Sequence, residues 1–378
     1  MSSAGLVAIL SVFGYGIVVA LLGSIKLRLA ERLKLDDAQV GRLFTALNLT
    51  SLVMVLVVGV LLDKYGHQPV IICGFALSAL AVLLISRVPS YPLVVASCIL
   101  LGIGGMGINT GGNTLLVPAI DAANPARASN LGNTFFGVGA FIIPLLTAFL
   151  FRRMKYGATV TVVAIILALP IIAAATAAYP EVSAEFQVST FFKVLGTAAV
   201  LVGGIALFCY IGLEVSMGGW ITTYLKSLQF PEGQASTILS GFWIALMVGR
   251  FVASFVLRGI APERQAWVIV VLAFLAAITI GIMIVTRNRG LAAVATIATG
   301  LCFAPLFPTT VGVTFAHYEQ SVHGSVFGAI FAIGLIGGSF LPAAIGSYSK
   351  GKSIQKSLTI LAVAALVLCI IGIVMTKV

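Results

Sequence analysis

Charged residues are scarce in this sequence. Only 9% of its 378 residues are Asp, Glu, Lys or Arg, whereas soluble globular domains carry about 25%. Hydrophobic residues make up 60% of the chain. The shortage of charge excludes a soluble globular protein and predicts a chain that lies mostly within a lipid bilayer.

Residues that build metal and disulfide sites are also few. The three histidines have no metal-ligand spacing, and the five cysteines all fall inside apolar runs, which is typical of small packing residues. We therefore expect no metal site, no disulfide and no cofactor. These residues are His67, His317 and His323, and Cys73, Cys98, Cys209, Cys302 and Cys369.

The apolar runs lack paired carboxylates and nucleophile–histidine sets, which argues against a membrane enzyme. The pattern Gly102-x-Gly104-x-x-Gly107 lies inside an apolar run, not at a strand–turn–helix junction, so close helix packing explains it better than dinucleotide binding. The net charge of +11 comes mostly from loop residues that anchor helix ends in the headgroup zone. We therefore expect no nucleic-acid partner.

Apolar stretches of about 20 residues, the length that spans a bilayer, recur along the whole chain. Eleven polar breaks separate them and predict twelve transmembrane helices. The first run has no small-residue cleavage site, so it is interpreted as a retained span. No loop is long enough for an extra domain. The breaks are Lys26–Gln39, Asp63–Pro69, Arg87–Pro92, Asp121–Arg127, Arg152–Gly157, Pro180–Lys193, Lys226–Ala235, Arg258–Gln265, Arg287–Gly290, His317–Gly324 and Ser347–Ser357.

A weak internal repeat predicts two pseudo-symmetric six-helix halves, 1–180 and 193–378, joined by a cytoplasmic linker at 181–192 that contains Glu181 and Glu185. Two such halves around a central site are typical of transporters that work by alternating access. Offsets of 195 and 198 superpose Ala46, Met54, Gly59 and Asp63 on Gly241, Gly249, Ser254 and Arg258; Gly105 and Asn113 on Gly300 and Pro308; and Gly139 and Pro144 on Gly337 and Pro342.

Loop charges conflict with a cytoplasmic N-terminus. With that terminus cytoplasmic, the six loops on the opposite side hold fourteen Lys and Arg residues and the cytoplasmic side holds six, so the positive-inside rule favours the reverse orientation. The fourteen are Lys26, Arg28, Arg32, Lys34, Arg87, Arg152, Arg153, Lys155, Lys226, Arg287, Arg289, Lys350, Lys352 and Lys356; the six are Lys64, Arg127, Lys193, Arg258, Arg264 and Lys377.

Glu214 is a carboxylate in the middle of the apolar run Ala206–Trp220. A charge at membrane depth costs roughly 2.5–3.5 kcal/mol on translocon scales and normally marks a substrate or ion pathway. Glu214 could exchange a proton, coordinate sodium with other oxygens or accept hydrogen bonds from substrate hydroxyl groups. The alternative is a static pair in a helix interface. The first interpretation of the chain is therefore a solute transporter.

Four asparagines in predicted spans suit a ligand rich in hydroxyl groups, because carboxamides both donate and accept hydrogen bonds. Asn109 and Asn113 are four residues apart and Asn130 and Asn133 three apart, so each pair shares a helix face. As a structural alternative, each could join helices, contributing about 0.6 kcal/mol.

Aromatic and basic residues add further candidates. Trp220 and Trp243 could stack on a sugar ring, although tryptophan also favours membrane interfaces. Gly218 beside Gly219 could let its helix bend during gating. Arg250 either snorkels to the interface or pairs with a carbonyl or an acid in a gate.

The run Gly59-Val-Leu-Leu-Asp63-Lys64-Tyr-Gly66 resembles the loop signature of the major facilitator superfamily. Gly59 would allow close helix approach, and Asp63 would accept hydrogen bonds from a neighbouring helix end and latch one conformation. His67 and Gln68 replace the basic pair that usually follows.

Other segments resemble the fucose/glucose:cation symporter family, the relatives of fucose permease and the sodium-dependent glucose transporters. An acid of that family's fourth helix is replaced by Asn109, and its first-helix acid is missing, so proton coupling there does not carry over. Glu214 matches the sodium-dependent relatives. The segments are Gly102–Thr114, Ser129–Gly139, Phe208–Ile221, Gly249–Phe251, Leu306–Thr309, and Gly324-Ser with Ile336–Ser339.

The resemblance implies an all-α major facilitator fold, both termini cytoplasmic, in the plasma (inner) membrane. We expect a monomer that transports a neutral hexose, bound by the four asparagines, Glu214, Trp220 and Trp243, with sodium or a proton coupled through Glu214 and with Asp63 and Arg250 in gating. The alternatives are efflux or uptake of an amphipathic or anionic compound, or a sugar sensor that does not transport.

Overall fold

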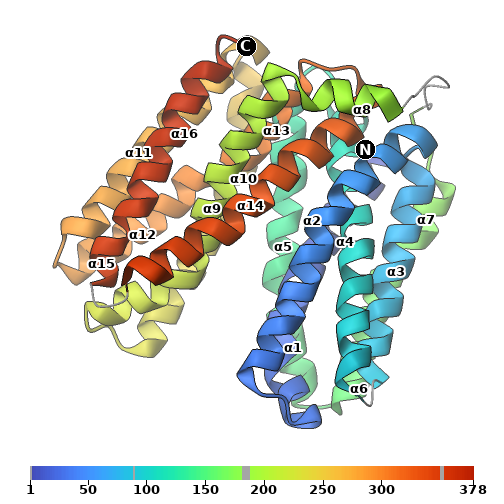
Figure 1. Ribbon diagram of the computed structural model, residues 1–378, viewed down its shortest axis with the longest axis horizontal. Helices are drawn as coiled ribbons and strands as arrows, with labels where there is room; N and C mark the ends of the chain where they lie inside the picture. Colours follow the sequence, from blue (N-terminus) through green and yellow to red (C-terminus); the bar gives the residue numbers. More distant parts are fainter. Residues whose placement is uncertain (1, 88–89, 181–187, 350–352) are drawn as a thin grey trace. The chain divides into compact units, whose positions relative to one another are not determined.

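The computed structural model describes residues 2–87, 90–180, 188–349 and 353–378. Within those ranges the regular structure is helical throughout. The helices are α1 (Ser3–Leu33), α2 (Asp37–Tyr65), α3 (His67–Arg87), α4 (Tyr91–Ile120), α5 (Pro125–Phe151), α6 (Tyr156–Ala168), α7 (Pro170–Thr176), α8 (Val188–Leu195), α9 (Ala198–Ser227), α10 (Glu232–Val256), η1 (Leu257–Gly259), η2 (Pro262–Arg264), α11 (Ala266–Val285), α12 (Arg289–Phe303), α13 (Leu306–Phe315), η3 (Gln320–Val322), α14 (His323–Ser349), α15 (Ile354–Ser357) and α16 (Thr359–Met375) (Figure 1).

The twelve spans predicted from the polar breaks are confirmed. Among the described residues, twelve helical segments are long and apolar enough to cross a membrane. Several of them join two shorter helices: α6 continues into α7, and α12 into α13. The all-α fold class predicted for the chain is therefore correct.

The chain forms two compact units. Unit 1 comprises residues 1–122, 135–191 and 320–328, and unit 2 comprises 123–134, 192–319 and 329–378. The sequence-based division into 1–180 and 193–378 remains a prediction. Of the predicted linker, residues 181–187, with Glu181 and Glu185, lie outside the described residues, and α8 begins at Val188.

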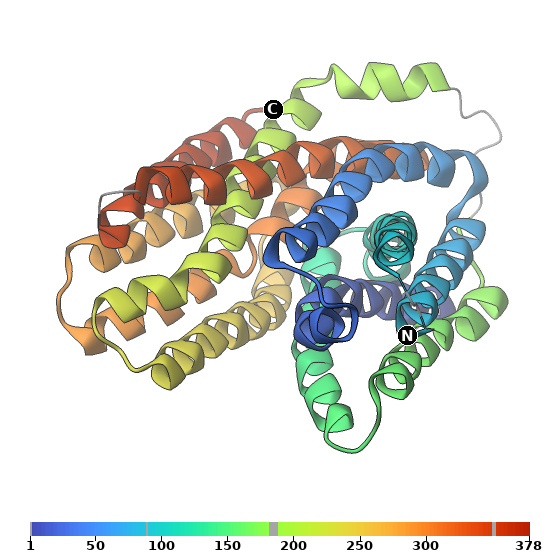
Figure 2. The ribbon, with the colours of Figure 1, turned by 60° about the horizontal axis from the view of Figure 1, so that its bottom comes forward.

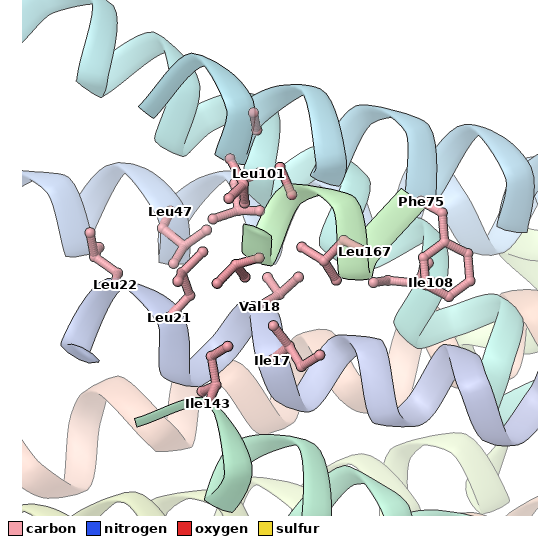
Figure 3. Packing of buried hydrophobic residues seen from close by; sticks show 14 of the residues in the cluster. Ile17, Val18, Leu21, Leu22, Leu47, Phe75, Leu101, Ile108, Ile143 and Leu167 are labelled. Atoms are coloured by element: carbon pink, nitrogen blue, oxygen red, sulfur yellow. The ribbon is translucent and has the colours of Figure 1, made fainter. Parts of the chain in front are cut away.

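Unit 1 is built around α4, which packs against α1, α2 and α3 (Figure 2, where α4 is seen nearly end-on). Small residues permit this approach: a Cβ on Gly107 would lie 2.9 Å from the Cα of Gly74. The packing role predicted for the glycines of this run is confirmed. Apolar side chains such as Val18, Leu21 and Leu101 fill the space between the helices (Figure 3).

Unit 2 is organised around two neighbouring sets of helices. α9 packs against α10, α13 and α16, and α11 packs against α12 and α16 (Figure 1). Close approach again depends on glycine, because a Cβ on Gly337 would lie 2.0 Å from the carbonyl oxygen of Phe208. α9 carries Glu214 and α10 carries Arg250, so the packing of these two helices brings the two buried charges together.

Candidate functional site

Arg250 is a buried cation that donates hydrogen bonds to acceptors on α5, on α9 and at the α12–α13 break. Its residue exposure is 2%. Nε donates to the carbonyl oxygen of Ala304 at 3.1 Å and Nη1 to the carbonyl oxygen of Asn133 at 3.4 Å. Nη2 donates to the Tyr210 hydroxyl at 3.0 Å and to Oε1 of Glu214 at 3.3 Å. The snorkelling interpretation of Arg250 is wrong, because the guanidinium is enclosed within unit 2.

The acceptor at Ala304 arises from the local sequence. Proline has no N–H, so Pro308 cannot donate to the carbonyl four residues earlier, which is that of Ala304. Pro305 also has no N–H to donate to the carbonyl four residues earlier. α12 ends at Phe303, and α13 begins at Leu306. The break thus frees a buried carbonyl, and Arg250 supplies its missing donor.

Glu214 is the charge partner of Arg250. It lies near the middle of α9, and Tyr210 stands one turn before it on the same face. The side chain of Glu214 is 16% exposed while that of Arg250 is 2% exposed. The carboxylate is therefore the accessible member of the pair. Because a buried charge without a partner is strongly destabilising, the two residues depend on each other.

Asn130 and Asn133 lie on the first turns of α5, in unit 2. Asn133 contributes its backbone carbonyl to Arg250, and its side-chain nitrogen donates to Ser129. Nδ2 of Asn130 donates to the Thr309 hydroxyl on α13 at 3.0 Å and to the carbonyl oxygen of Ala126. The structure therefore joins Asn133, through its backbone, to the Arg250–Glu214 pair, whereas the side chain of Asn130 links α5 to α13.

Asn109 and Asn113 lie on α4, in unit 1. Both are buried. Nδ2 of Asn113 donates to the backbone oxygen of Asn109 at 3.0 Å and to its Oδ1 at 2.9 Å. The shared helix face predicted from their spacing is confirmed.

The two tryptophans pack against glycines of neighbouring segments. A Cβ on Gly218 would lie 2.7 Å from Cζ2 of Trp243, and one on Gly346 would lie 3.3 Å from Cζ2 of Trp220. Trp243 is 37% exposed and meets Phe242 edge-on. Gly218 thus makes room for an indole ring, while the proposed bend at this glycine stays a prediction.

Asp63, at the end of α2, caps the first turn of α14, the part of that helix that belongs to unit 1. Its carboxylate accepts the backbone N–H groups of Gly324 at 2.8 Å and Ser325 at 2.7 Å, in the first turn of α14. These are orphan donors at the positive end of a helix dipole. A Cβ on Gly59 would lie 2.4 Å from the carbonyl oxygen of Gly324, so close approach here needs glycine. The expected contacts are present, and the latch function stays a prediction.

Sequence reasoning missed Tyr210, Ala304 and Thr309 as members of the site. The two prolines at positions 305 and 308 carried a signal, since they predict a broken helix with a free carbonyl. No local pattern indicated that an arginine would bind it. Among the described residues, no group of three or more His, Cys, Asp or Glu side chains is placed to hold a metal ion.

Comparison with known proteins identifies the family. The model of the Major Facilitator Superfamily matches residues 4–342. Protein TsgA of Escherichia coli (strain SE11) is 27% identical over 268 residues, which cover 70% of this chain and 67% of TsgA.

Two solved structures share the fold. The fucose:proton symporter FucP of E. coli superposes with a TM-score of 0.84 at 17% identity, covering 98% of each chain. The human organic anion transporter MFSD10 superposes with a TM-score of 0.77 at 15% identity, covering 98% of each chain. At these low sequence identities, the superposition shows a shared fold and nothing more. With the family match across most of its length, the chain belongs to the Major Facilitator Superfamily of multi-pass membrane transporters.

Proposed function

We propose that this transporter moves a neutral monosaccharide, such as a hexose, by alternating access, and that Glu214 couples the movement to a cation. The observation that carries the proposal is the pairing of a partly accessible carboxylate, Glu214, with the sealed guanidinium of Arg250. A proton or sodium ion that binds Glu214 competes with Arg250 for the same oxygens. Cation binding therefore changes the contact between α9 and α10.

A shift of Arg250 would also alter its contacts with α5 and with the α12–α13 break, because its other donors bind carbonyl oxygens there. Loss of the contact to Glu214 leaves Arg250 held by the carbonyl oxygens of Asn133 and Ala304 and by Tyr210. In this scheme the cation shifts the equilibrium between two arrangements of these helices, which is what coupling requires.

The asparagines supply the proposed sugar ligands. Nδ2 of Asn109 and Oδ1 of Asn130 are buried and lack a hydrogen-bond partner among the described residues. A buried polar atom without a partner costs about 1–3 kcal/mol. A hydroxyl group both donates and accepts hydrogen bonds, so it would satisfy either atom, and this supports a role in binding for each asparagine within its own unit.

Charge balance favours a neutral solute over an anion. Glu214 and Arg250 neutralise each other, and a bound anion would have to replace Glu214 at the guanidinium. That exchange is the specific basis for the second candidate, transport of an anionic or amphipathic compound. A sensor, the third possibility, would bind sugar without flux. We place both termini in the cytoplasm and the chain in the inner membrane as parts of the same proposal.

The test is uptake of labelled hexoses by proteoliposomes, with and without imposed sodium or pH gradients. Accumulation beyond equilibrium under one gradient would support symport and identify the ion. Equilibration alone would leave a uniporter with Glu214 as a sugar ligand. Sugar binding without flux would favour the sensor, and inhibition of flux by organic anions without any sugar response would favour the second candidate.

The coupling residue is tested with Glu214→Gln, which keeps the shape of the side chain and removes its charge. We expect retained sugar binding and loss of cation-driven accumulation. The matched control is Glu232→Gln, because the side chain of Glu232 is 83% exposed and pairs with Lys226. Unchanged accumulation in Glu214→Gln would reject coupling through this residue.

A further inference from the structure

A second site lies on unit 2, away from the buried ion pair. A pocket of about 670 Å³ lies between α10, α11 and the α12–α13 break. Ala253 and Leu257 form its buried floor, while Val252, Val256 and Trp267 on its walls are each at least half exposed. The volume falls in the range of about 300–1,000 Å³ that is typical of small-molecule sites.

The walls of this groove face the surroundings of the chain at bilayer depth. The helical segments that carry them, Glu232–Gly259 and Pro262–Val285, are two of the candidate spans. Apart from Arg264, the side chains that line the groove are apolar or aromatic. An occupant therefore reaches the groove from the membrane and contacts it mainly through a hydrocarbon chain.

One end of the groove carries positive charge. Arg264 lines it, Trp267 follows one turn later, and Arg258 lies in the same short connection between α10 and α11. Both arginines are exposed, and their side chains have no hydrogen-bond or ion-pair partner in the part of the chain that the structure describes. Tryptophan and arginine together are typical of the depth at which lipid headgroups lie.

We propose that this groove binds an anionic phospholipid of the surrounding bilayer. The acyl chain lies along α10 and α11, and the phosphate group binds Arg264 with Arg258 nearby. Glu263 is the one acid among residues 257–268, so the two arginines leave this segment with a net positive charge. A zwitterionic lipid would fill the same groove but bind more weakly, since each basic residue favours binding of an anionic headgroup about fivefold.

The position of the groove connects it to the ion pair. Gly249 and Pro305, which line it, are the chain neighbours of Arg250 and Ala304. An acyl chain in the groove therefore contacts the helix break that Arg250 holds. The lipid site does not depend on which solute the protein transports.

Fluorescence quenching tests the proposal in the full chain reconstituted into vesicles. Phosphatidylglycerol or phosphatidylcholine with brominated acyl chains quenches nearby tryptophan, and the part of the quenching lost in Trp267→Phe reports the groove. We expect the brominated phosphatidylglycerol to quench Trp267 at about one fifth of the mole fraction needed for brominated phosphatidylcholine, or less.

Arg264→Gln should reduce this preference about fivefold. Arg42→Gln, which removes an exposed arginine from α2, should leave the preference unchanged. Val252→Phe, which narrows the groove from its exposed wall, should weaken quenching by both lipids.

Three results would overturn the proposal. Equal quenching by the two lipids would show only a general lipid annulus. A preference that Arg264→Gln does not alter would place the anionic site elsewhere. Quenching by neither lipid would mean that a non-lipid molecule or a second copy of the chain covers the groove.

Discussion

Arg250 on α10 donates its Nε–H to the carbonyl oxygen of Ala304, 54 residues later in the chain, at 3.1 Å. The carbonyl is available because Pro308 has no N–H to offer it. One side chain thus completes the hydrogen bonding of a broken helix and also neutralises Glu214. Arginine suits this position because its rigid fork presents five donors in a fixed arrangement.

Pro308→Ala restores the N–H that the Ala304 carbonyl lacks. We expect the new helical hydrogen bond to compete with Arg250 and make the break less pronounced. Transport should slow several-fold while the melting temperature of the purified protein stays the same or rises, because proline inside a helix costs about 3 kcal/mol. Flux assays and circular dichroism on the same preparation check this, and unchanged flux would contradict it.

Arg250→Met leaves Glu214 as an unpaired charge. We expect the free energy of unfolding to fall by about 3–5 kcal/mol, the usual cost of breaking a buried pair. Adding Glu214→Leu should recover part of the loss, since the double variant contains no unpaired charge. Denaturant titration in detergent measures both variants. A double variant that is less stable than Arg250→Met alone would argue against a mutually dependent pair.

Asp63→Asn keeps the shape of the side chain but offers one acceptor where the carboxylate offers two. We expect faster amide hydrogen exchange at Gly324 and Ser325 and a loss of about 1.5–3 kcal/mol, as for hydrogen bonds to a charged group. Asp37→Asn, an exposed change at the other end of the same helix, serves as the control. Exchange in the first turn of α14 that matches the control would exclude the capping role.

Gly59→Ala introduces a Cβ that would lie 2.4 Å from the carbonyl oxygen of Gly324. Because backbone must move to admit it, we expect a loss of about 1–3 kcal/mol. Gly41→Ala on the same helix meets nothing within 4 Å and should be neutral or stabilising by about 0.5–1 kcal/mol. Thermal unfolding of the two variants side by side measures the difference, and equal stabilities would reject the close approach.

The fold was predictable because its signals are local. Runs of apolar residues and short polar breaks locate the spans, and four-residue spacing places Asn109 beside Asn113 on one helix face. The contacts of Arg250 were not predictable in this way. Its partners lie 36 to 117 residues away, on α5, on α9 and at the α12–α13 break, so only tertiary packing brings them together. The sequence marked Glu214 as unusual and left open that Arg250 pairs with a carbonyl or an acid, but it could not indicate that these two residues pair with each other.

The cap that Asp63 places on α14 sets an order of events during synthesis. Its two donors are 261 and 262 residues further along the chain. At about 5–20 residues per second, they leave the ribosome roughly 13–52 s after Asp63 does. Unit 1, which includes residues 320–328, cannot be completed before most of unit 2 has been made. A nascent chain that stops before residue 324 therefore has neither donor for the Asp63 carboxylate at the end of its second span.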